Sequence, residues 1–363
     1  MSETILKEEE KIVFALRSLY RKYGYLPYKT NKFEEYDLYV ANKEFLMGDG
    51  VITFNDTDGR LLALKPDVTL SIIKNGGDEA GTRKVFYNEN VYRISAKTER
   101  FKETMQVGLE CIGDIGLYDV YETVVLAAGS LQTVSPRFAL DVSHIGVVSA
   151  ILDGIGKGEE FSAKILQCVA GKNRHETLAL CAEYGISEKD TKKLETLVGA
   201  YGKPEEVIAA LKAVCDGAEC KAIEDLERLC KLFAASEYAD NIHLDFSVVN
   251  DRNYYDDIVF KGFIDGIGEG VLSGGRYDKL LKRMGKQSGG IGFAVNIDAL
   301  EGFGLTARET DADVLILYND ATPTETLIAK TNALIQSGKT VTVRKNAGKL
   351  RYKEIVDMTG GVQ

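Results

Sequence analysis

The most constraining feature of this chain is the segment from Asn250 to Asp278, where short apolar runs alternate with tyrosine and glycine. A Tyr-Tyr pair precedes the apolar run at 258–260, and Gly-Gly-Arg-Tyr-Asp closes the segment at 274–278. This pattern predicts two strands joined by a glycine-rich turn and ending at a short helix. Because tyrosine offers a flat apolar wall and a hydroxyl group, the tyrosine pair and its polar rim suit the binding of a small molecule.

Length and composition are typical of a globular protein with two or three domains. The chain has 363 residues, 45% of them hydrophobic, and a formal net charge of −10. It has no run of about 18 apolar residues, and its acidic N-terminus lacks the basic start and apolar core of a secretory signal. We therefore expect a cytoplasmic protein without a membrane span. An acidic surface repels polyphosphate, which argues against a nucleic-acid partner.

The cysteines and histidines do not predict a metal centre. The six cysteines show no Cys-x-x-Cys spacing, and the three histidines are scattered along the chain. We expect reduced, partly buried thiols, and neither a metal nor another cofactor. The Gly-x-Gly-x-Gly run at 266–270 has predicted strands on both sides, so it indicates a hairpin turn and not a dinucleotide fingerprint.

The hydrophobic patterns predict an α+β core that is interrupted by helices. Helical periodicity covers 5–24 and 118–133, and strands are expected at 84–93 and 105–113. From about 160 to 236 helix formers dominate and strand signals vanish, which predicts an inserted helical subdomain. Further strands are expected at 51–54, 61–64, 242–249, 256–264, 269–273 and 291–295, with a turn into a helix over 274–284 and a last helix after residue 295.

Two domains are expected in this chain. Residues 1–305 are predicted to form the core, in which an antiparallel sheet is flanked by helices. Residues 306–363 show a strand at 313–318, a helix around 323–337 and a strand at 340–344. This short βαβ segment is too small for a complete α/β domain of usual size.

A dispersed set of polar residues lies at the ends or on the faces of the expected strands. Gln106 and Glu110 are four residues apart, which places both on one face of a strand. Together with Asp67 they can offer carboxylates and an amide to an ammonium or imidazole group. Each residue also has a simpler explanation: Asp67 as a helix cap, Glu110 as a solvated strand residue, and Tyr254-Tyr255 as the core and surface of one strand.

The order and spacing of these residues resemble the catalytic core of histidyl-tRNA synthetases and their paralogues, which have the class II aminoacyl-tRNA synthetase fold. Lys65–Thr69 resembles the family's Arg-Pro-Glu/Asp-x-Thr segment, Arg93 through Glu110 resembles motif 2, and 292–294 resembles the start of motif 3. Tyr254-Tyr255 and Gly274–Asp278 resemble the two histidine signatures, so that the similarity covers roughly residues 5 to 302. The resemblance implies a binding site for L-histidine made by Asp67, Thr69, Arg93, Gln106, Glu110, Tyr254 and Tyr255.

Departures from the family pattern indicate that the reaction chemistry is lost. Adenylate formation builds negative charge on phosphate, and arginines with magnesium must stabilise that charge. Arg93 matches the motif 2 arginine, but Ala299 stands at the motif 3 arginine and Asn250 at the arginine before the tyrosine pair. Ser95 also replaces an acidic residue of motif 2, and Asn31 replaces the motif 1 proline. Since each missing charge donor typically costs about 10²–10³ in rate, efficient adenylation is not expected.

Two other arginines keep alternative functions open. Arg252 is two residues from Asn250, which on a strand keeps the same face but moves the charge by roughly 7 Å. If Arg252 reaches the phosphate site, the chain is a divergent histidyl-tRNA synthetase, or an enzyme that activates an amino acid for another acceptor. Arg276 is assigned to the fold or to the pocket.

A chain that keeps the ligand pocket and loses the phosphate chemistry resembles the regulatory-subunit paralogues of ATP phosphoribosyltransferase. The resemblance implies no catalytic residues of its own and assembly with the short-form catalytic subunit, as a homodimer within a hetero-oligomer. It also implies a requirement in the first step of histidine biosynthesis and feedback inhibition by L-histidine. A tRNA partner is not expected, because the C-terminal segment is short and the chain is acidic.

Overall fold

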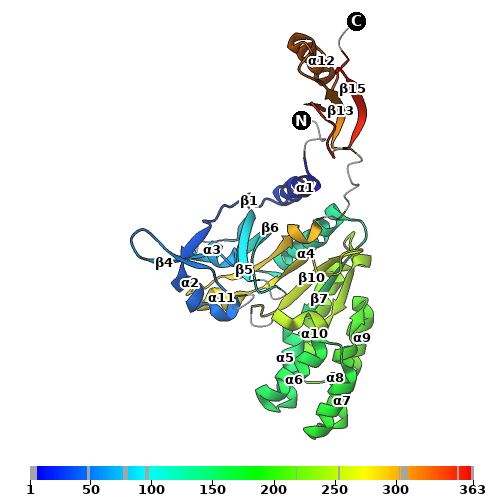
Figure 1. Cartoon of the computed structure of the whole chain (residues 1–363). Coiled ribbons are helices and arrows are strands. Elements are labelled where there is room, and N and C mark those ends of the chain that lie inside the picture. Colours follow the sequence, from blue (N-terminus) through cyan, green and yellow to red (C-terminus); the bar gives the residue numbers. More distant parts are fainter. Residues whose placement is uncertain are drawn as a thin grey trace. The chain divides into compact units, whose positions relative to one another are not determined.

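The computed structural model describes residues 6–46, 50–76, 81–94, 98–217, 219–251, 254–301, 303, 310–349 and 351–360. The chain divides into two compact units, residues 1–301 and residues 302–363. The first unit contains a large mixed sheet covered by helices, and the second contains a small parallel sheet with helix α12 (Figure 1).

Among the described residues, nine strands form the sheet at the centre of the first unit. Most neighbouring strands are antiparallel, while β1–β5 and β7–β9 are parallel pairs. The two longest of the described strands, β5 and β6, pair along nearly their whole length, from Arg83 opposite Ile112 to Ile94 opposite Phe101. In sheet order the strands are β1 (Leu26–Pro27), β5 (Arg83–Ile94), β6 (Phe101–Gly113), β12 (Gly289–Asn296), β11 (Leu272–Arg276), β10 (Ile258–Ile264), β7 (Phe138–His144), β9 (Ile242–Asp245) and β8 (Tyr201–Gly202).

Helices α1 (Glu8–Lys22) and α4 (Leu117–Val134) cover one face of the sheet and enclose much of the core. The acidic first turn of α1 suits the positive end of the helix dipole, and the chain leaves this helix at Gly24, whose φ of +82° favours glycine. The buried hydroxyl groups of Tyr20 and Ser130 form a hydrogen bond of 3.0 Å between the two helices. This bond satisfies two polar groups that would otherwise be costly to bury.

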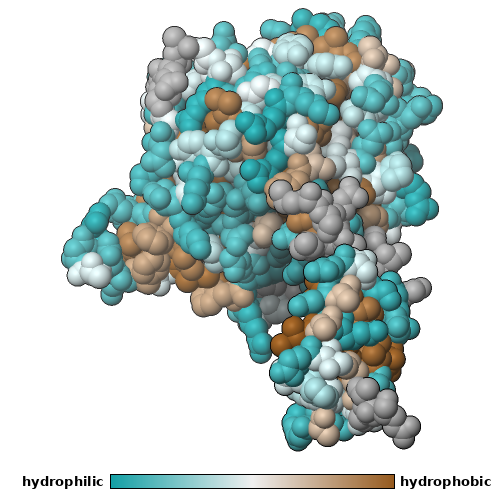
Figure 2. Space-filling model, turned by 90° about the horizontal axis from the view of Figure 1, so that it is seen from above, coloured by the Kyte–Doolittle hydropathy of each residue, from teal (hydrophilic) through white to brown (hydrophobic). Residues whose placement is uncertain are grey.

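A small three-stranded sheet carries exposed aromatic residues. Phe33 and Phe54 pack edge to face at 5.6 Å and remain exposed, and Figure 2 shows hydrophobic atoms on this projecting part of the molecule. The predicted hairpin between 51–54 and 61–64 is confirmed as the pair β3–β4. The elements around it are β2 (Phe33–Glu35), α2 (Tyr36–Ala41), η1 (Lys43–Phe45), β3 (Thr53–Asn55), β4 (Leu61–Leu64) and α3 (Thr69–Lys74).

Helices fill the region in which helix formers dominate the sequence, and they gather at one end of the sheet (Figure 1). The side chains of Asn173 and Ser187 accept hydrogen bonds from the backbone at the starts of α7 and α8, and Pro204 begins α9. The helices are α5 (Ile145–Ile155), α6 (Gly158–Ala170), α7 (Arg174–Glu183), α8 (Glu188–Gly199), α9 (Pro204–Val214) and α10 (Glu219–Phe233), followed by η2 (Ala239–Asn241).

Several predicted elements are wrong in type or extent. The strand expected over 242–249 ends at Asp245, because its carboxylate accepts a hydrogen bond from the Ser247 amide and the chain turns into the 3-10 helix η3 (Phe246–Asp251). The expected last helix is only the 3-10 helix η4 (Ile297–Leu300). Strand β7 was not predicted, and the short strand β8 lies where no strand was expected.

The segment Gly274–Arg276 is also not a turn but the second half of strand β11, and helix α11 (Asp278–Arg283) follows it. The glycines are needed there because neighbours lie against the strand. A Cβ atom at Gly275 would meet the ring of Tyr255 at 2.6 Å. A glycine pair that looks like a turn in the sequence therefore marks a close approach of side chains in the sheet.

The second unit has a parallel sheet in the order β14–β13–β15. The predicted strand, helix and strand are present as β13 (Ala312–Leu317), α12 (Thr324–Gln336) and β14 (Val341–Arg344). The third strand, β15 (Tyr352–Asp357), was not predicted, since its charged residues obscure the alternation. The unit is thus more than the expected βαβ fragment.

Two other expectations can be compared with the structure. All six cysteines are free thiols and five of them are buried, in agreement with the prediction of reduced, partly buried thiols. Within the residues that the structure describes, no helix is both long enough and apolar enough to cross a membrane.

Candidate functional site

One cavity on the sheet brings together all seven residues to which the resemblance assigned ligand binding. The free space among the lining side chains, including the mouth that opens to solvent, is about 410 Å³. The lining residues are Asp67, Thr69, Tyr87, Arg93, Gln106, Glu110, Tyr254, Tyr255, Ser273, Tyr277, Gly292, Phe293 and Ala294.

The register of the central strands explains why these residues converge. Gln106 and Glu110 share one face of β6, as their spacing predicts, and Gly108 lies between them. Gly108 pairs with Tyr87 on β5, whose hydroxyl occupies the space that a Cβ atom at Gly108 would need. On the other side Gly292 pairs with Glu110, and a Cβ atom there would overlap the Glu110 carboxylate. Two glycines thus leave room for the tyrosine and the carboxylate.

Glu110 is the most enclosed charged group of the cavity, with only 2% of its surface exposed. Its Oε1 accepts a hydrogen bond of 2.6 Å from the Thr69 hydroxyl, and its Oε2 accepts one from the Tyr277 hydroxyl. Burial raises the pKa of Glu110 to about 8, and the charge of Asp67 adds to the rise, while the two hydroxyl groups oppose it. The explanation of Glu110 as a solvated strand residue is therefore wrong.

Asp67 and Arg93 lie at the same cavity with different partners. Asp67 Oδ1 accepts a hydrogen bond of 2.9 Å from the Leu70 amide, so Asp67 also caps helix α3 as predicted. Burial raises the pKa of Asp67, and the Leu70 amide and the positive charge of Arg93 partly offset the rise. Arg93 Nε donates a hydrogen bond of 2.7 Å to the Pro66 carbonyl. Among the described residues that line the cavity, Arg93 is the only cation.

The tyrosine pair does not form the core and surface of one strand. Tyr254 and Tyr255 precede β10, and both are buried, with exposures of 7% and 6%. The ring of Tyr254 lies 4.8 Å from that of Tyr255 and 6.1 Å from that of Tyr277. Burial raises the pKa of Tyr254 and Tyr277 well above the usual value, so both hydroxyl groups are neutral donors. They give the cavity aromatic walls with polar tips.

Some residues of the cavity and its surroundings were not predicted from the sequence. Tyr277 belongs to the recognised Gly-Gly-Arg-Tyr-Asp block, but its bond to Glu110 depends on a fold contact across 167 residues. Tyr87 and Ser273 enter the cavity only through strand register. Asn296 pairs with Gln106, and its side-chain oxygen is buried without a partner among the described residues. Periodicity alone carries no signal for such pairings.

The positions of the missing arginines are partly described. Ala299 lies in η4, and the neighbouring Asp298 accepts a hydrogen bond of 3.1 Å from the Met105 amide of β6. The structure therefore places an acid close to the site where the family has a cation. Arg276 pairs with Asp278 at 2.9 Å and with Asp257 at 3.4 Å, and it does not line the cavity. The fold therefore accounts for Arg276.

Three further positions of the sequence comparison lie outside the described residues: Ser95, Arg252 and the side chain of Asn250.

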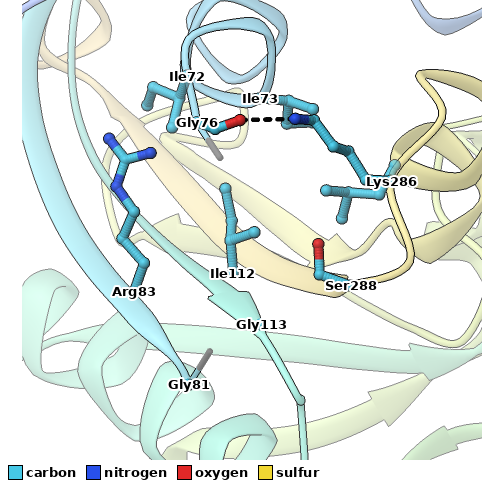
Figure 3. A pocket seen from close by; sticks show the side chains of 10 residues that line it. Ile72, Ile73, Gly76, Gly81, Arg83, Ile112, Gly113, Lys286 and Ser288 are labelled. Carbon is cyan, nitrogen blue, oxygen red and sulfur yellow. Dashed lines mark hydrogen bonds between the residues drawn. The ribbon is translucent and has the colours of Figure 1, made fainter. Parts of the chain in front are cut away.

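A second cavity, beside the C-terminal end of α3, contains none of the predicted site residues (Figure 3). Its Lys286 donates a hydrogen bond of 2.7 Å to the Gly76 carbonyl, a favourable place for a cation near a helix end. In the described part of the chain, no three His, Cys, Asp or Glu side chains are grouped to hold a metal ion.

Comparison with known proteins gives the family. The model of the histidyl-tRNA synthetase family matches residues 2–300. An ATP phosphoribosyltransferase regulatory subunit from Clostridium novyi is 30% identical over 311 residues, which cover 82% of this chain and 73% of the relative. The chain belongs to the histidyl-tRNA synthetase family, and within it to the ATP phosphoribosyltransferase regulatory subunits. The class II synthetase-like fold and the α+β class predicted from the sequence are confirmed.

Solved structures agree with this membership in fold. A regulatory subunit/histidyl-tRNA synthetase from Bacillus halodurans has a TM-score of 0.75 at 22% identity, covering 100% of this chain and 97% of that one. A chain of the ATP phosphoribosyl transferase (HisG:HisZ) complex from Thermotoga maritima has a TM-score of 0.63 at 20% identity, covering 80% of this chain and 97% of that one. Regulatory subunits of ATP phosphoribosyltransferase thus share the synthetase architecture described above.

Proposed function

We propose that this regulatory subunit binds L-histidine in the cavity around Glu110, has no adenylation activity of its own, and controls a short-form catalytic subunit of ATP phosphoribosyltransferase. One observation carries the proposal: the seven residues of the histidine pattern line one cavity that contains a single described cation. The complex would carry out the first step of histidine biosynthesis, with the phosphoribosyl transfer on the partner chain. Such a subunit would act in the cytoplasm.

The chemistry of the cavity suits L-histidine. Glu110 and Asp67 offer carboxyl groups to an ammonium or imidazole N–H, and Arg93 offers a cation to the ligand carboxylate. Tyr254 and Tyr255 provide flat walls against which an imidazole ring can stack. An amino acid with an apolar side chain would still offer its ammonium group but would lack the imidazole N–H, so one of the two carboxyl groups would gain no donor from the ligand.

The same cavity is poorly suited to adenylation. Charge that develops on the α-phosphate of ATP needs several preorganised cations, and Arg93 is the only one among the described lining residues. The acid Asp298 lies in η4 next to Ala299, and it accepts a hydrogen bond from the Met105 amide of β6. Removing one such donor commonly lowers the rate by about 10²–10³, so the activity of a synthetase is not expected.

Assembly with a catalytic partner is supported by the Thermotoga maritima complex, whose matching chain is covered over 97% of its length. We infer a homodimer of the regulatory chain within a hetero-oligomer. Feedback then requires that histidine binds one assembly state more tightly than another, because a ligand shifts an equilibrium only through differential affinity.

Two measurements made together test this proposal. The purified chain should show no histidine-dependent ATP–pyrophosphate exchange, and it should co-purify with a short-form catalytic subunit and raise its phosphoribosyltransferase activity.

Histidine should inhibit that complex, and Glu110→Ala should weaken the inhibition at least tenfold, because a charged or polar partner of the ligand is lost. Robust exchange would identify a synthetase, and unchanged inhibition in Glu110→Ala would place the histidine site elsewhere.

A further inference from the structure

The carboxyl group of Glu110 is held in place without a counter-charge. The Thr69 hydroxyl donates to one oxygen and the Tyr277 hydroxyl to the other. Gly292 leaves the space that the carboxyl group fills. Glu110 forms no ion pair with any described lysine, arginine or histidine, although only 2% of its surface is exposed.

The groups that face Glu110 from the surrounding elements do not supply a positive charge. Before α3 lies Asp67, a second carboxyl group whose negative charge opposes ionisation of Glu110. From β5 comes the neutral hydroxyl of Tyr87, and the neutral Tyr254 precedes β10. Arg93 also lines the cavity but forms no ion pair with Glu110, and its Nε donates to the Pro66 carbonyl. A buried carboxyl group in such surroundings keeps its proton at neutral pH.

We propose that a cationic ligand enters this cavity in exchange for the proton of Glu110, so that binding releases a proton and ligand affinity rises with pH. In the empty cavity the carboxyl group is neutral. When the ligand arrives, its ammonium or imidazole N–H takes the position of the proton at the carboxylate, and the proton passes to solvent. This inference rests on the proposed function only for the identity of the ligand as L-histidine.

Tyr277 and Thr69 are positioning residues in this exchange. Each hydroxyl group contacts one carboxyl oxygen. In the neutral form the hydroxyl at the protonated oxygen can accept the Glu110 proton, and both hydroxyls donate once that proton has left, so the carboxyl group does not need to rotate when it becomes charged. They also favour the ionised form and thereby bring the exchange into the neutral pH range, because burial alone would raise the pKa of Glu110 further.

The exchange can be tested by calorimetric titration of the full-length chain with L-histidine at pH 7, in two buffers with different ionisation enthalpies. The wild type should release about one proton per histidine, and its affinity should be about tenfold higher at pH 7 than at pH 6 and level off above pH 8. Glu110→Gln keeps the shape of the side chain but has no proton to lose, so any residual binding should release none. The Glu110→Gln titration also measures the protons exchanged by the imidazole of the ligand itself, and this number is subtracted from the wild-type value.

Tyr277→Phe separates positioning from a merely structural role. Loss of the hydroxyl donor should move the midpoint of the affinity–pH curve to higher pH, whereas a structural defect would lower affinity equally at all pH values.

Histidine binding without proton release in the wild type would overturn the exchange and leave the proposed function intact. If L-histidine does not bind, the assignment of the ligand fails, and titration with histamine decides the exchange: proton release supports it and its absence overturns it.

Discussion

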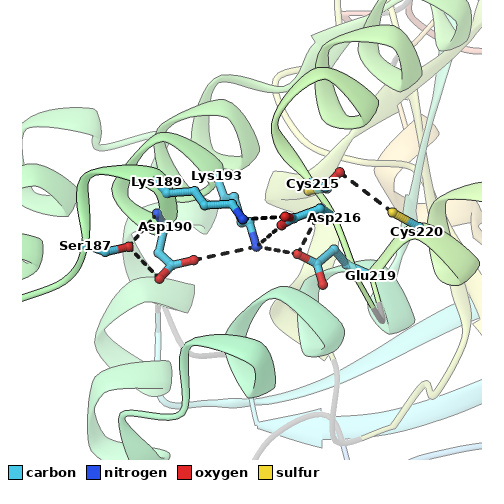
Figure 4. Close-up of polar contacts among 8 residues, drawn as sticks. All are labelled: Ser187, Lys189, Asp190, Lys193, Cys215, Asp216, Glu219 and Cys220. Atoms are coloured by element: carbon cyan, nitrogen blue, oxygen red, sulfur yellow. Dashed lines mark hydrogen bonds and ion pairs between the residues drawn. The ribbon is translucent and has the colours of Figure 1, made fainter.

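The helical insert and the cavity around Glu110 surround their buried charged groups with opposite kinds of partner. In the insert, Lys193 is 8% exposed and its ammonium group contacts the 4%-exposed Glu219, with Asp216 at 3.2 Å and Asp190 at 3.6 Å (Figure 4). In the cavity, Glu110 is equally buried but has only hydroxyl partners. The insert pairs its buried carboxyl group with a lysine, while the cavity contains a buried carboxyl group that has no counter-charge among the described residues.

The two carboxyl groups accordingly differ in proton affinity. Burial would raise the pKa of Glu219, but the hydrogen bond and charge of Lys193 outweigh it and lower that pKa. Burial raises the pKa of Glu110 to about 8 because no cation opposes it. The difference teaches that a buried charge which is paired within the fold serves stability, while one without a counter-charge is a candidate for binding.

The largest effect is expected when the buried ion pair of the insert loses its cation. Lys193→Met leaves Glu219 buried without a cation and should lower the free energy of unfolding by about 3–5 kcal/mol, measured by urea denaturation. Lys189→Met is the matched control, because Lys189 pairs with the same Asp216 on the exposed surface and its loss should change stability little. Equal effects of the two substitutions would show that the buried network does not stabilise the insert.

A smaller effect is expected from crowding the cavity. Gly292→Ala places a methyl group against the Glu110 carboxylate and should cost about 1–3 kcal/mol of unfolding free energy, with loss of histidine binding in a calorimetric titration. Gly268→Ala is the control, since a Cβ atom in that turn meets nothing within 4 Å. If Gly292→Ala binds histidine as the wild type does, the ligand does not depend on the position of Glu110.

A pH-dependent effect tests the carboxyl group that lacks a counter-charge. Because the folded-state pKa of Glu110 lies above its ordinary value, this group stabilises the fold most at low pH, and its contribution falls as pH rises toward 8. Relative to the wild type, ligand-free Glu110→Gln should therefore gain stability between pH 5 and pH 8, by up to about 1.4 kcal/mol per pH unit. Denaturation of both proteins across this range measures the gain; parallel stability curves would mean that Glu110 is already ionised when the protein is empty.

Most of the cavity residues could be predicted from the sequence, but fewer of the contacts between them could. The family resemblance assigned Asp67, Gln106 and Glu110 to the cavity, and their local spacing placed Gln106 and Glu110 on one face of a strand. The bond from Tyr277 to Glu110 could not be foreseen, because it depends on the pairing of β6, β12 and β11. The glycine pair at 274–275 was misread for the same reason: close packing within a sheet and a turn require the same residue.

The same holds for the fold: elements that follow from local sequence patterns could be predicted, and elements that depend on contacts distant in the sequence could not. Long helices and the central strands β5 and β6 follow from periodicity, which persists over many residues. Strand β9 is only four residues long. It ends where the Ser247 backbone amide donates a hydrogen bond to the Asp245 carboxylate, which overrides the apolar pattern that continues beyond it. Strand β15 is highly charged and gains its place from pairing with β13.

The account depends on Glu110 being neutral in the empty cavity and ionised in the occupied one. The most direct measurement is a difference infrared spectrum of the full-length chain at pH 7, taken with and without saturating L-histidine. We predict that the ligand removes the band of one protonated carboxyl group and that Glu110→Gln lacks this change. A histidine-bound spectrum that keeps the protonated band, or a loss that persists in Glu110→Gln, would contradict the account.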